Sequence, residues 1–288
     1  MKHYGVDNIW KLSDYIKMCR ITPRNTCYSY AKKCGFTVFE IWESDMNKLN
    51  DGEFSIYIIN LLKNIKMIHN KYPRTYHLPY SPGSTNDDKK LSGDWFKYYI
   101  GQEIVITEKL DGSNISMSAN GVCERSTATE TRKPWTRNLW DPQEGLYWKI
   151  RDYIGPDETI YGENLYGEHS IHYGNLDNYF HLFAVNDGVN WYSWDDVKMM
   201  ANIMNIPYVP ELWRGLIFNE NDLKILVEKY TAAPSIYGEQ REGIVMRITN
   251  SFSLEDFPKY VCKWVRPNHV QTDEHWTRNW KKAELNYG

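Results

Sequence analysis

Residues 104–114, with the sequence IVITEKLDGSN, join a β-rich apolar run to an Asp-Gly turn and place one lysine between them. β-Branched residues favour a strand, and Asp-Gly is a common hairpin signal. A lysine attacks phosphorus only when it is deprotonated, so a nucleophilic Lys109 needs burial or nearby cations that lower its pKa. The Lys-x-Asp-Gly tetrad alone does not establish this role, because a lysine beside such a turn is usually solvated.

Five further segments follow the tetrad in order. They are Glu124-Arg125-Ser126, YGEN at 161–164, YFHLF at 179–183, REGIVMR at 241–247 and VCKWVR at 261–266. This series resembles the covalent nucleotidyltransferase superfamily of ligases and capping enzymes. Residues 72–83 and 269–276 also resemble segments of one group of ATP-dependent RNA ligases from phages and bacteria, so the resemblance covers about residues 70–277.

The resemblance implies that the early segments bind ATP. Lys109 is implied to displace pyrophosphate and to hold AMP through a phosphoramide bond. Glu163 is implied to accept hydrogen bonds from the ribose, and Phe183 matches the aromatic residue that stacks on the purine. Arg125 follows a hairpin turn at Asn120-Gly121 and is implied to contact the ribose or an incoming 5′-phosphate.

Two acidic residues flank the lysine. Glu108 is implied to read the adenine amino group. Asp111 projects from the same turn as Lys109 and either orients the lysine or the ribose, or closes an Asx turn.

The resemblance implies that the late segments hold a metal and the phosphates. Glu242 matches an acidic residue that binds a divalent metal, and Mg²⁺ (or Mn²⁺) prefers a few carboxylates together with water and phosphate oxygens. Lys263 matches the basic residue that contacts the α-phosphate. Many relatives have a second lysine where this chain has Val265, and Arg266 would face the opposite side of a regular strand.

The hydrophobic pattern predicts an α+β fold. We expect strands at 103–107, 115–118, 159–162, 179–185, 243–249 and 259–265, and helices at 146–154, 194–204 and 220–230. Strands mixed with helices in this way indicate mainly antiparallel sheets with flanking helices, and the resemblance implies a nucleotidyltransferase domain over residues 71–288. The Pro- and Gly-rich connector at 72–92 is expected to be an ordered loop. Only 22 residues follow Arg266, so no C-terminal OB-fold is expected.

Residues 1–70 lie outside most of the resemblance and are expected to form a small α/β appendage. Helices near 9–19 and 51–69 and a β-like run at 36–42 support this. A packing or substrate-contacting role is favoured over a metal cluster built from Glu40, Glu43 and Asp45.

The formal net charge of −3 argues against capture of nucleic acid by the charge of the whole molecule, so a polyanion site must be a local patch. Five cysteines without Cys-x-x-Cys spacing indicate neither a disulfide framework nor a zinc site. His169, His172 and His181 are close in sequence, but they lack a cysteine at ligand spacing. No leader or long apolar run opens the chain, so we expect a cytoplasmic protein without a membrane partner.

These observations predict an ATP-dependent RNA ligase. It would join 3′-hydroxyl and 5′-phosphate ends through lysyl-AMP and adenylylated-end intermediates, in RNA repair or nick sealing. The expected partners are ATP, Mg²⁺ and RNA ends, with a nicked duplex or an RNA–DNA hybrid left open, and a monomer is expected. Two alternatives remain, a minimal ATP-dependent DNA ligase and a non-catalytic protein that binds nucleic-acid ends. Retention of Lys109, Glu163 and Glu242 favours an enzyme.

Overall fold

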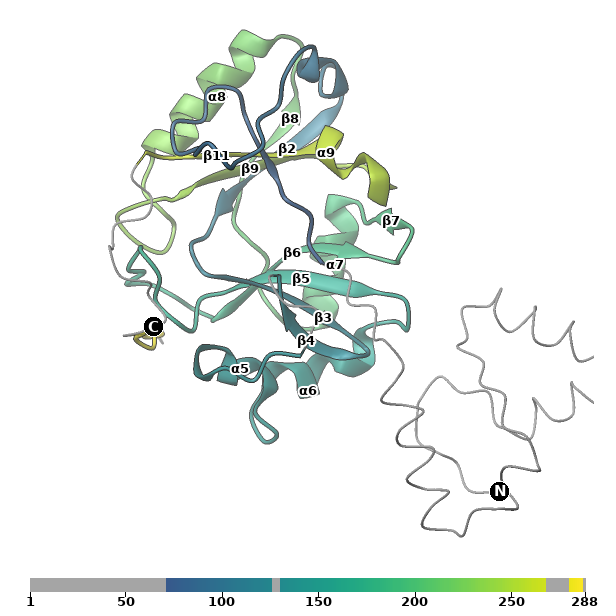
Figure 1. Ribbon diagram of the computed structural model, residues 1–288, viewed down its shortest axis with the longest axis vertical. Coiled ribbons are helices and arrows are strands. Elements are labelled where there is room, and N and C mark those ends of the chain that lie inside the picture. Colours follow the sequence, from purple (N-terminus) through teal and green to yellow (C-terminus); the bar gives the residue numbers. More distant parts are fainter. Residues whose placement is uncertain (1–70, 126–129, 268–279, 287–288) are drawn as a thin grey trace, which may run out of the picture. The chain divides into compact units, whose positions relative to one another are not determined.

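The computed structural model describes residues 71–125, 130–267 and 280–286. They form an α+β fold of two sheets with flanking helices, as the sequence predicts (Figure 1). The predicted appendage at residues 1–70 and its carboxylates lie outside the described residues. Within the described part of the chain, no helix is long and apolar enough to cross a membrane.

The first sheet, sheet A, has the strand order β1-β11-β9-β2-β8. Its strands are β1 (Tyr76–His77), β2 (Glu103–Lys109), β8 (Glu211–Leu216), β9 (Gly243–Ile248) and β11 (Val261–Val265). All neighbours are antiparallel except β1 and β11, which run parallel. The connector at 72–92 is ordered as expected, but it also contributes β1.

The second sheet, sheet B, has the order β10-β7-β6-β5-β3-β4. Its strands are β3 (Ser113–Ser118), β4 (Gly121–Glu124), β5 (Thr159–Asn164), β6 (Phe180–Asn186), β7 (Asn190–Trp191) and β10 (Phe252–Ser253). All of its neighbouring strands are antiparallel. The Lys-x-Asp-Gly tetrad therefore spans the crossing from sheet A to sheet B, because β2 ends at Lys109 and β3 begins at Ser113.

The helices confirm the predicted pattern in part. They are α5 (Arg137–Trp140), α6 (Leu146–Ile150), α7 (Trp194–Ile203), α8 (Glu220–Ala232) and α9 (Phe257–Tyr260), with 3₁₀ turns η1 (Trp95–Tyr98), η2 (Pro134–Thr136), η3 (Arg151–Tyr153) and η4 (Leu254–Asp256). The predicted helix at 146–154 divides into α6 and η3. The predicted strand at 259–265 was wrong at its start, because Pro258 sits in the first turn of α9, where its fixed φ suits a helix.

Two apolar clusters hold the sheets. Alternate residues of β2 face opposite sides of sheet A. Ile104 and Ile106 pack with Leu223 and Val227 of α8, whereas Val105 packs in the larger cluster with residues of sheet B. We call this second side the inner face of sheet A.

Tyr72 fixes the start of the connector in the larger cluster. Its ring lies within 5.5 Å, centroid to centroid, of four other aromatic rings, those of Tyr161, Phe183, Trp191 and Phe257. Aromatic rings at these separations and tilts attract one another beyond the area that they bury.

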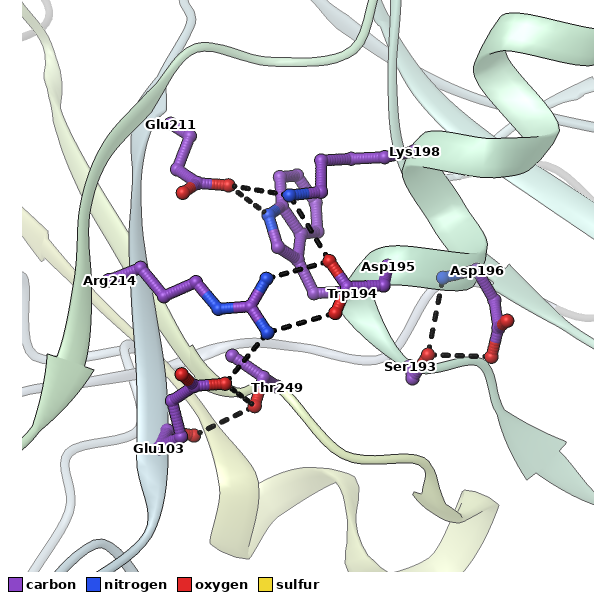
Figure 2. Close-up of polar contacts among 9 residues, drawn as sticks. All are labelled: Glu103, Ser193, Trp194, Asp195, Asp196, Lys198, Glu211, Arg214 and Thr249. Atoms are coloured by element: carbon purple, nitrogen blue, oxygen red, sulfur yellow. Dashed lines mark hydrogen bonds and ion pairs between the residues drawn. The ribbon is translucent and has the colours of Figure 1, made fainter.

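A polar network ties α7 to sheet A (Figure 2). Arg214 of β8 donates to Asp195 of α7 at 2.6 Å and to Glu103 of β2 at 2.7 Å. The indole of Trp194 donates to Glu211 at 2.6 Å. Because α7 packs against β6, this network helps to fix sheet B against sheet A.

Candidate active site

The register of sheet A brings the two predicted lysines to one face. Lys109 lies opposite Gly243, and Thr107 lies opposite Val245, which in turn lies opposite Lys263. Directly opposed residues of antiparallel strands project to the same side, so both lysines project from the inner face.

Lys109 is held by the predicted metal-binding carboxylate. Its ammonium donates to Glu242 Oε2 at 2.6 Å, and the side chains of the two residues are 25% and 7% exposed. Burial acts to lower the pKa of Lys109, but the carboxylates of Glu242 and Glu163 outweigh it and raise the pKa above its usual value. The expectation of a lowered pKa was therefore wrong for this state of the protein, in which Lys109 is protonated.

Burial disfavours the ionised forms of the two glutamates. Burial raises the pKa of Glu163 to about 8, partly offset by Lys109. Burial likewise raises the pKa of Glu242, again with Lys109 acting in the opposite direction. Glu163 also accepts from the backbone N–H of Gly112 at 3.1 Å. Lys109 thus offsets only part of the effect of burial on the two carboxyl groups.

Asp111 connects the loop that follows β5 to the Lys-x-Asp-Gly turn at residues 109–112 through hydrogen bonds. Its carboxylate accepts from the backbone N–H groups of Ser170 and Ile171 at 2.8 and 3.0 Å, and its own N–H donates to the Tyr173 hydroxyl at 2.8 Å. These are not the bonds of an Asx turn, which stay within the turn itself.

A cavity of about 510 Å³ opens beside Lys109. Ligand pockets of enzymes commonly have this size. Six of the predicted residues line it, namely Glu108, Lys109, Arg125, Glu163, Phe183 and Lys263, whereas Asp111 and Glu242 lie outside its lining. The structure therefore gathers most of the predicted site around one pocket.

A bulge in β6 orients the Phe183 side chain toward the pocket. The register of β5 and β6 shifts between Tyr161 and Gly162, which pair with Ala184 and Leu182 and leave Phe183 between them. A bulge of this kind turns a side chain away from regular alternation. Phe183 meets Tyr72 edge to face with ring centroids 5.0 Å apart.

Lys263 and Arg125 supply positive charge to the pocket. Burial, together with the nearby Lys109, lowers the pKa of Lys263 to about 8. The backbone N–H of Arg125 donates to the carbonyl of Asn114 at 3.1 Å, which folds the end of β4 back beside β3 as the hairpin signal predicts. Arg266 binds the backbone of Glu242 through its own N–H, while Val265 is buried.

Glu108 precedes Lys109 on β2 and also lines the pocket. Its carboxylate accepts from the N–H of Ile236 at 3.2 Å and lies 3.4 Å from the Arg241 guanidinium. The second oxygen, Oε1, is buried and has no hydrogen-bond partner among the described residues. Contact of Glu108 with an adenine stays a prediction.

The three histidines have different surroundings. His169 lines the pocket 3.3 Å from the Ser113 hydroxyl, His172 pairs with Glu168 at the surface, and His181 is buried against Tyr237. Among the described residues, no three His, Cys, Asp or Glu side chains are grouped so that they could hold a metal.

Sequence reasoning missed Arg247 as a pocket residue. Arg247 is 6% exposed, lines the pocket and places its guanidinium 4.9 Å from the Trp194 ring centroid. Burial lowers its pKa. The signal was present, because Gly243, Val245 and Arg247 alternate along one strand and so share a face.

The sequence of this chain matches one known protein family. The family model for RNA ligases matches residues 102–265, a stretch that contains every predicted site residue. This chain belongs to the RNA ligase family.

Solved structures of RNA ligases are similar to the chain at low identity. A mutant of the Naegleria gruberi RNA ligase with ATP and Mn is 17% identical, with a TM-score of 0.45, over 68% of this chain and 60% of that chain. An archaeal ATP-dependent RNA ligase is 14% identical, with a TM-score of 0.44, over 68% and 48%. The chain thus spans about half to three fifths of the length of these RNA ligases. No curated protein sequence matches it significantly.

Proposed function

We propose that this member of the RNA ligase family is an ATP-dependent RNA ligase that reacts through Lys109. The observation that carries the proposal is the position of the Lys109 ammonium, which lines a nucleotide-sized pocket, contacts Glu242 at 2.6 Å and shares a face with Lys263. Phosphoryl transfer depends mainly on positioning and on neutralising the phosphate charge, and these groups supply both.

In the first step the Lys109 amine attacks the α-phosphorus of ATP. A P–N bond forms, the bond between the α-phosphorus and its bridging oxygen breaks, and pyrophosphate leaves. Lys109 must first lose its proton to water, which requires that its ion pair with Glu242 weaken. Lys263 would then face the α-phosphate from the neighbouring position on sheet A.

The remaining predicted residues would hold the nucleotide. Phe183 would stack on the purine, Glu163 would accept from the ribose hydroxyls and Arg125 would contact the ribose or the 5′-phosphate of RNA. Glu108 and Asp111 are proposed as supporting residues, the first toward the adenine amino group and the second through the turn that carries Lys109.

The carboxylates fit a divalent cation. Burial raises the pKa of both Glu163 and Glu242, so these carboxyl groups lack the positive charge that would favour their ionised forms, and a bound cation would supply it. Glu242 is the proposed ligand, with water and phosphate oxygens completing the shell that Mg²⁺ or Mn²⁺ prefers. The bound cation would neutralise phosphate charge.

The later steps join RNA. AMP would pass from Lys109 to a 5′-phosphate, and a 3′-hydroxyl would then attack that phosphorus with release of AMP. We propose RNA ends as the substrate, in repair or nick sealing, by a monomer in the cytoplasm. Labelled nicked RNA, RNA–DNA hybrids, single strands and nicked DNA, tested in parallel, separate the nick, hybrid and DNA ligase variants of this proposal.

Labelled ATP tests the first step directly. Incubation with Mg²⁺ should give a covalent protein–AMP adduct that is labile in acid and stable in base, as a phosphoramide is. Lys109→Ala should abolish the adduct, whereas Lys97→Ala, a change at a 54% exposed lysine of η1, should leave it intact. Labelling that survives Lys109→Ala, or that needs GTP or NAD, contradicts the proposal.

A further inference from the structure

Three tryptophans, one lining the pocket and two beyond it, are held in fixed orientations on η2, α5 and α6. The indole N–H of Trp135 donates to Glu124 at 3.1 Å, that of Trp140 to Thr136 at 3.1 Å and that of Trp148 to the carbonyl of Trp140 at 3.2 Å. Ordered aromatic rings lose little conformational freedom when a ligand stacks on them.

A cation lies over each of these rings. The distances to the ring centroids are 5.3 Å for Lys133 over Trp135, 5.4 Å for Arg132 over Trp140 and 5.7 Å for Arg151 over Trp148. Trp148 is 41% exposed, so part of its side chain is open to solvent. We call these three tryptophans and three cations the aromatic row.

The aromatic row is continuous with the pocket. Lys133 and Trp135 line the pocket, and Trp140 donates to the Lys133 carbonyl at 3.2 Å, so the hydrogen bonds lead from the pocket to Trp148. The carbonyl of Trp135 also accepts from the Asn164 side chain at 3.2 Å, next to Glu163 in β5. Figure 1 shows α5 and α6 beside β3 and β4, the strands that form this side of the pocket.

The charge of the aromatic row is largely balanced within the protein. Arg132 pairs with Glu130 at 2.6 Å, Lys133 with Glu124 at 2.8 Å and Arg151 with Asp152 at 3.3 Å. Attraction to phosphates is therefore weak here, and stacking on the rings is the main interaction that the row offers. Unpaired bases expose their faces for stacking, whereas bases within a duplex do not.

We infer that the aromatic row binds the unpaired strand of an RNA whose end reacts in the pocket. This inference rests on the proposed function, since it names the class of RNA that the same site would take. Successive bases would stack along Trp135, Trp140 and Trp148, with the end nearest Trp135 lying in the pocket. A single-stranded end or an overhang fits this surface better than a nick in a continuous duplex.

Direct binding tests this inference without ATP. The probes are a short 5′-phosphorylated single-stranded RNA and a blunt duplex that contains the same strand, and the Kd is measured by fluorescence anisotropy. The full-length protein should prefer the single strand. Trp148→Ala should weaken single-strand binding about 5- to 150-fold, the range for loss of one stacked base, without changing the salt dependence of binding.

Two control variants separate stacking from a general loss of structure. Trp148→Phe keeps a ring and should retain most of the affinity, and Phe218→Ala removes an aromatic side chain that is 64% exposed elsewhere and should not change it. Equal affinity of the parent and Trp148→Ala, equal binding of the duplex, or no binding of RNA overturns the inference. AMP labelling of the parent protein fails or succeeds independently of these results, so the proposed function is judged separately.

Discussion

Lys109 shows how a single residue combines two opposing requirements. Under the proposed function, its ammonium must stay in a buried pocket before the substrate arrives, and its amine must be free when the reaction begins. The ion pair with Glu242 meets the first requirement, because an isolated charge would be costly to bury. To meet the second requirement, Glu242 must give up its pairing with Lys109 and bind another cation instead.

Replacement of Glu242 tests this exchange. Glu242→Ala should slow adduct formation by more than about 10-fold, since even the outer partners of metal ligands contribute that much. The rate is measured across a Mg²⁺ titration, with the exposed Glu239→Ala as the control. If the Glu242→Ala variant reacts at the parent rate at every Mg²⁺ concentration, Glu242 does not take part in the metal-dependent step.

The sequence predicted which residues line the pocket better than it predicted their charge state. Motif order identified Lys109, Glu163 and Lys263, which line one pocket. The direction of the Lys109 pKa was wrong because Glu163 in β5 and Glu242, just before β9, lie far along the chain, and their distance from the lysine cannot be read from spacing. Arg247 was missed because a buried arginine on a strand is exceptional by residue type.

At the scale of elements, the pairing of β5 with β6 brings Gly162 against the ring of Phe180. A Cβ atom at this position would lie 2.2 Å from the Phe180 ring. Gly162→Ala should therefore destabilise the protein by about 1–3 kcal/mol, as overpacking of a core does. Denaturant unfolding measures the effect, and Gly174→Ala is the matched control because a Cβ there meets nothing within 4 Å. If both variants are equally stable, close packing of Phe180 does not constrain this strand.

The network between α7 and β8 makes a contribution that depends on pH (Figure 2). The hydrogen bond from Arg214 lowers the pKa of Asp195 from 3.8 to about 2. A lowered carboxylate pKa stabilises the fold above the unfolded-state pKa, and this stabilisation is lost as the pH falls from about 4 to about 2. Asp195 is 60% exposed, so solvent screening limits the effect to about 1 kcal/mol or less.

Arg214→Gln should therefore lower the free energy of unfolding at neutral pH, and the difference from the parent should shrink toward pH 2. Urea unfolding at a series of pH values measures this difference. Lys224→Gln, which breaks an exposed pair with Glu220 within α8, serves as the comparison and should have a smaller effect. A difference for Arg214→Gln that grows on acidification would contradict the assigned role of Asp195.

The pattern of elements was predictable where periodicity is strong and local. Most of β2, β5, β6 and β9 and all of α7 and α8 follow the predicted ranges closely. β1 was missed because two residues carry no periodic signal, and its pairing with β11 depends on a distant segment. β8 was missed because its residues are nearly all half-buried and its sequence does not alternate clearly.

For the whole molecule, we predict that reaction with ATP does not need the residues before about residue 70, whereas efficient joining of RNA ends does. A chain that begins at Asn70 should form the AMP adduct, because every site residue lies between Glu108 and Lys263 and Tyr72 is retained in its core. Joining of a model nick should be less efficient, since the removed segment is proposed to affect sealing. Adduct and joining yields are compared on one soluble preparation. Equal loss of both yields, or an insoluble chain, would indicate that residues 1–70 are part of the catalytic core.

The parallel pairing of β1 with β11 sets the order in which the protein can form during translation. Ser81, which follows β1, binds Val265 of β11, 184 residues later. At typical synthesis rates of about 5–20 residues per second, β1 leaves the ribosome some 10–40 s before its neighbour exists. Sheet B, apart from the short β10, comes from residues 113–191 and can pair during that interval. The nascent chain must therefore keep β1 from unproductive pairing until β11 has been synthesised.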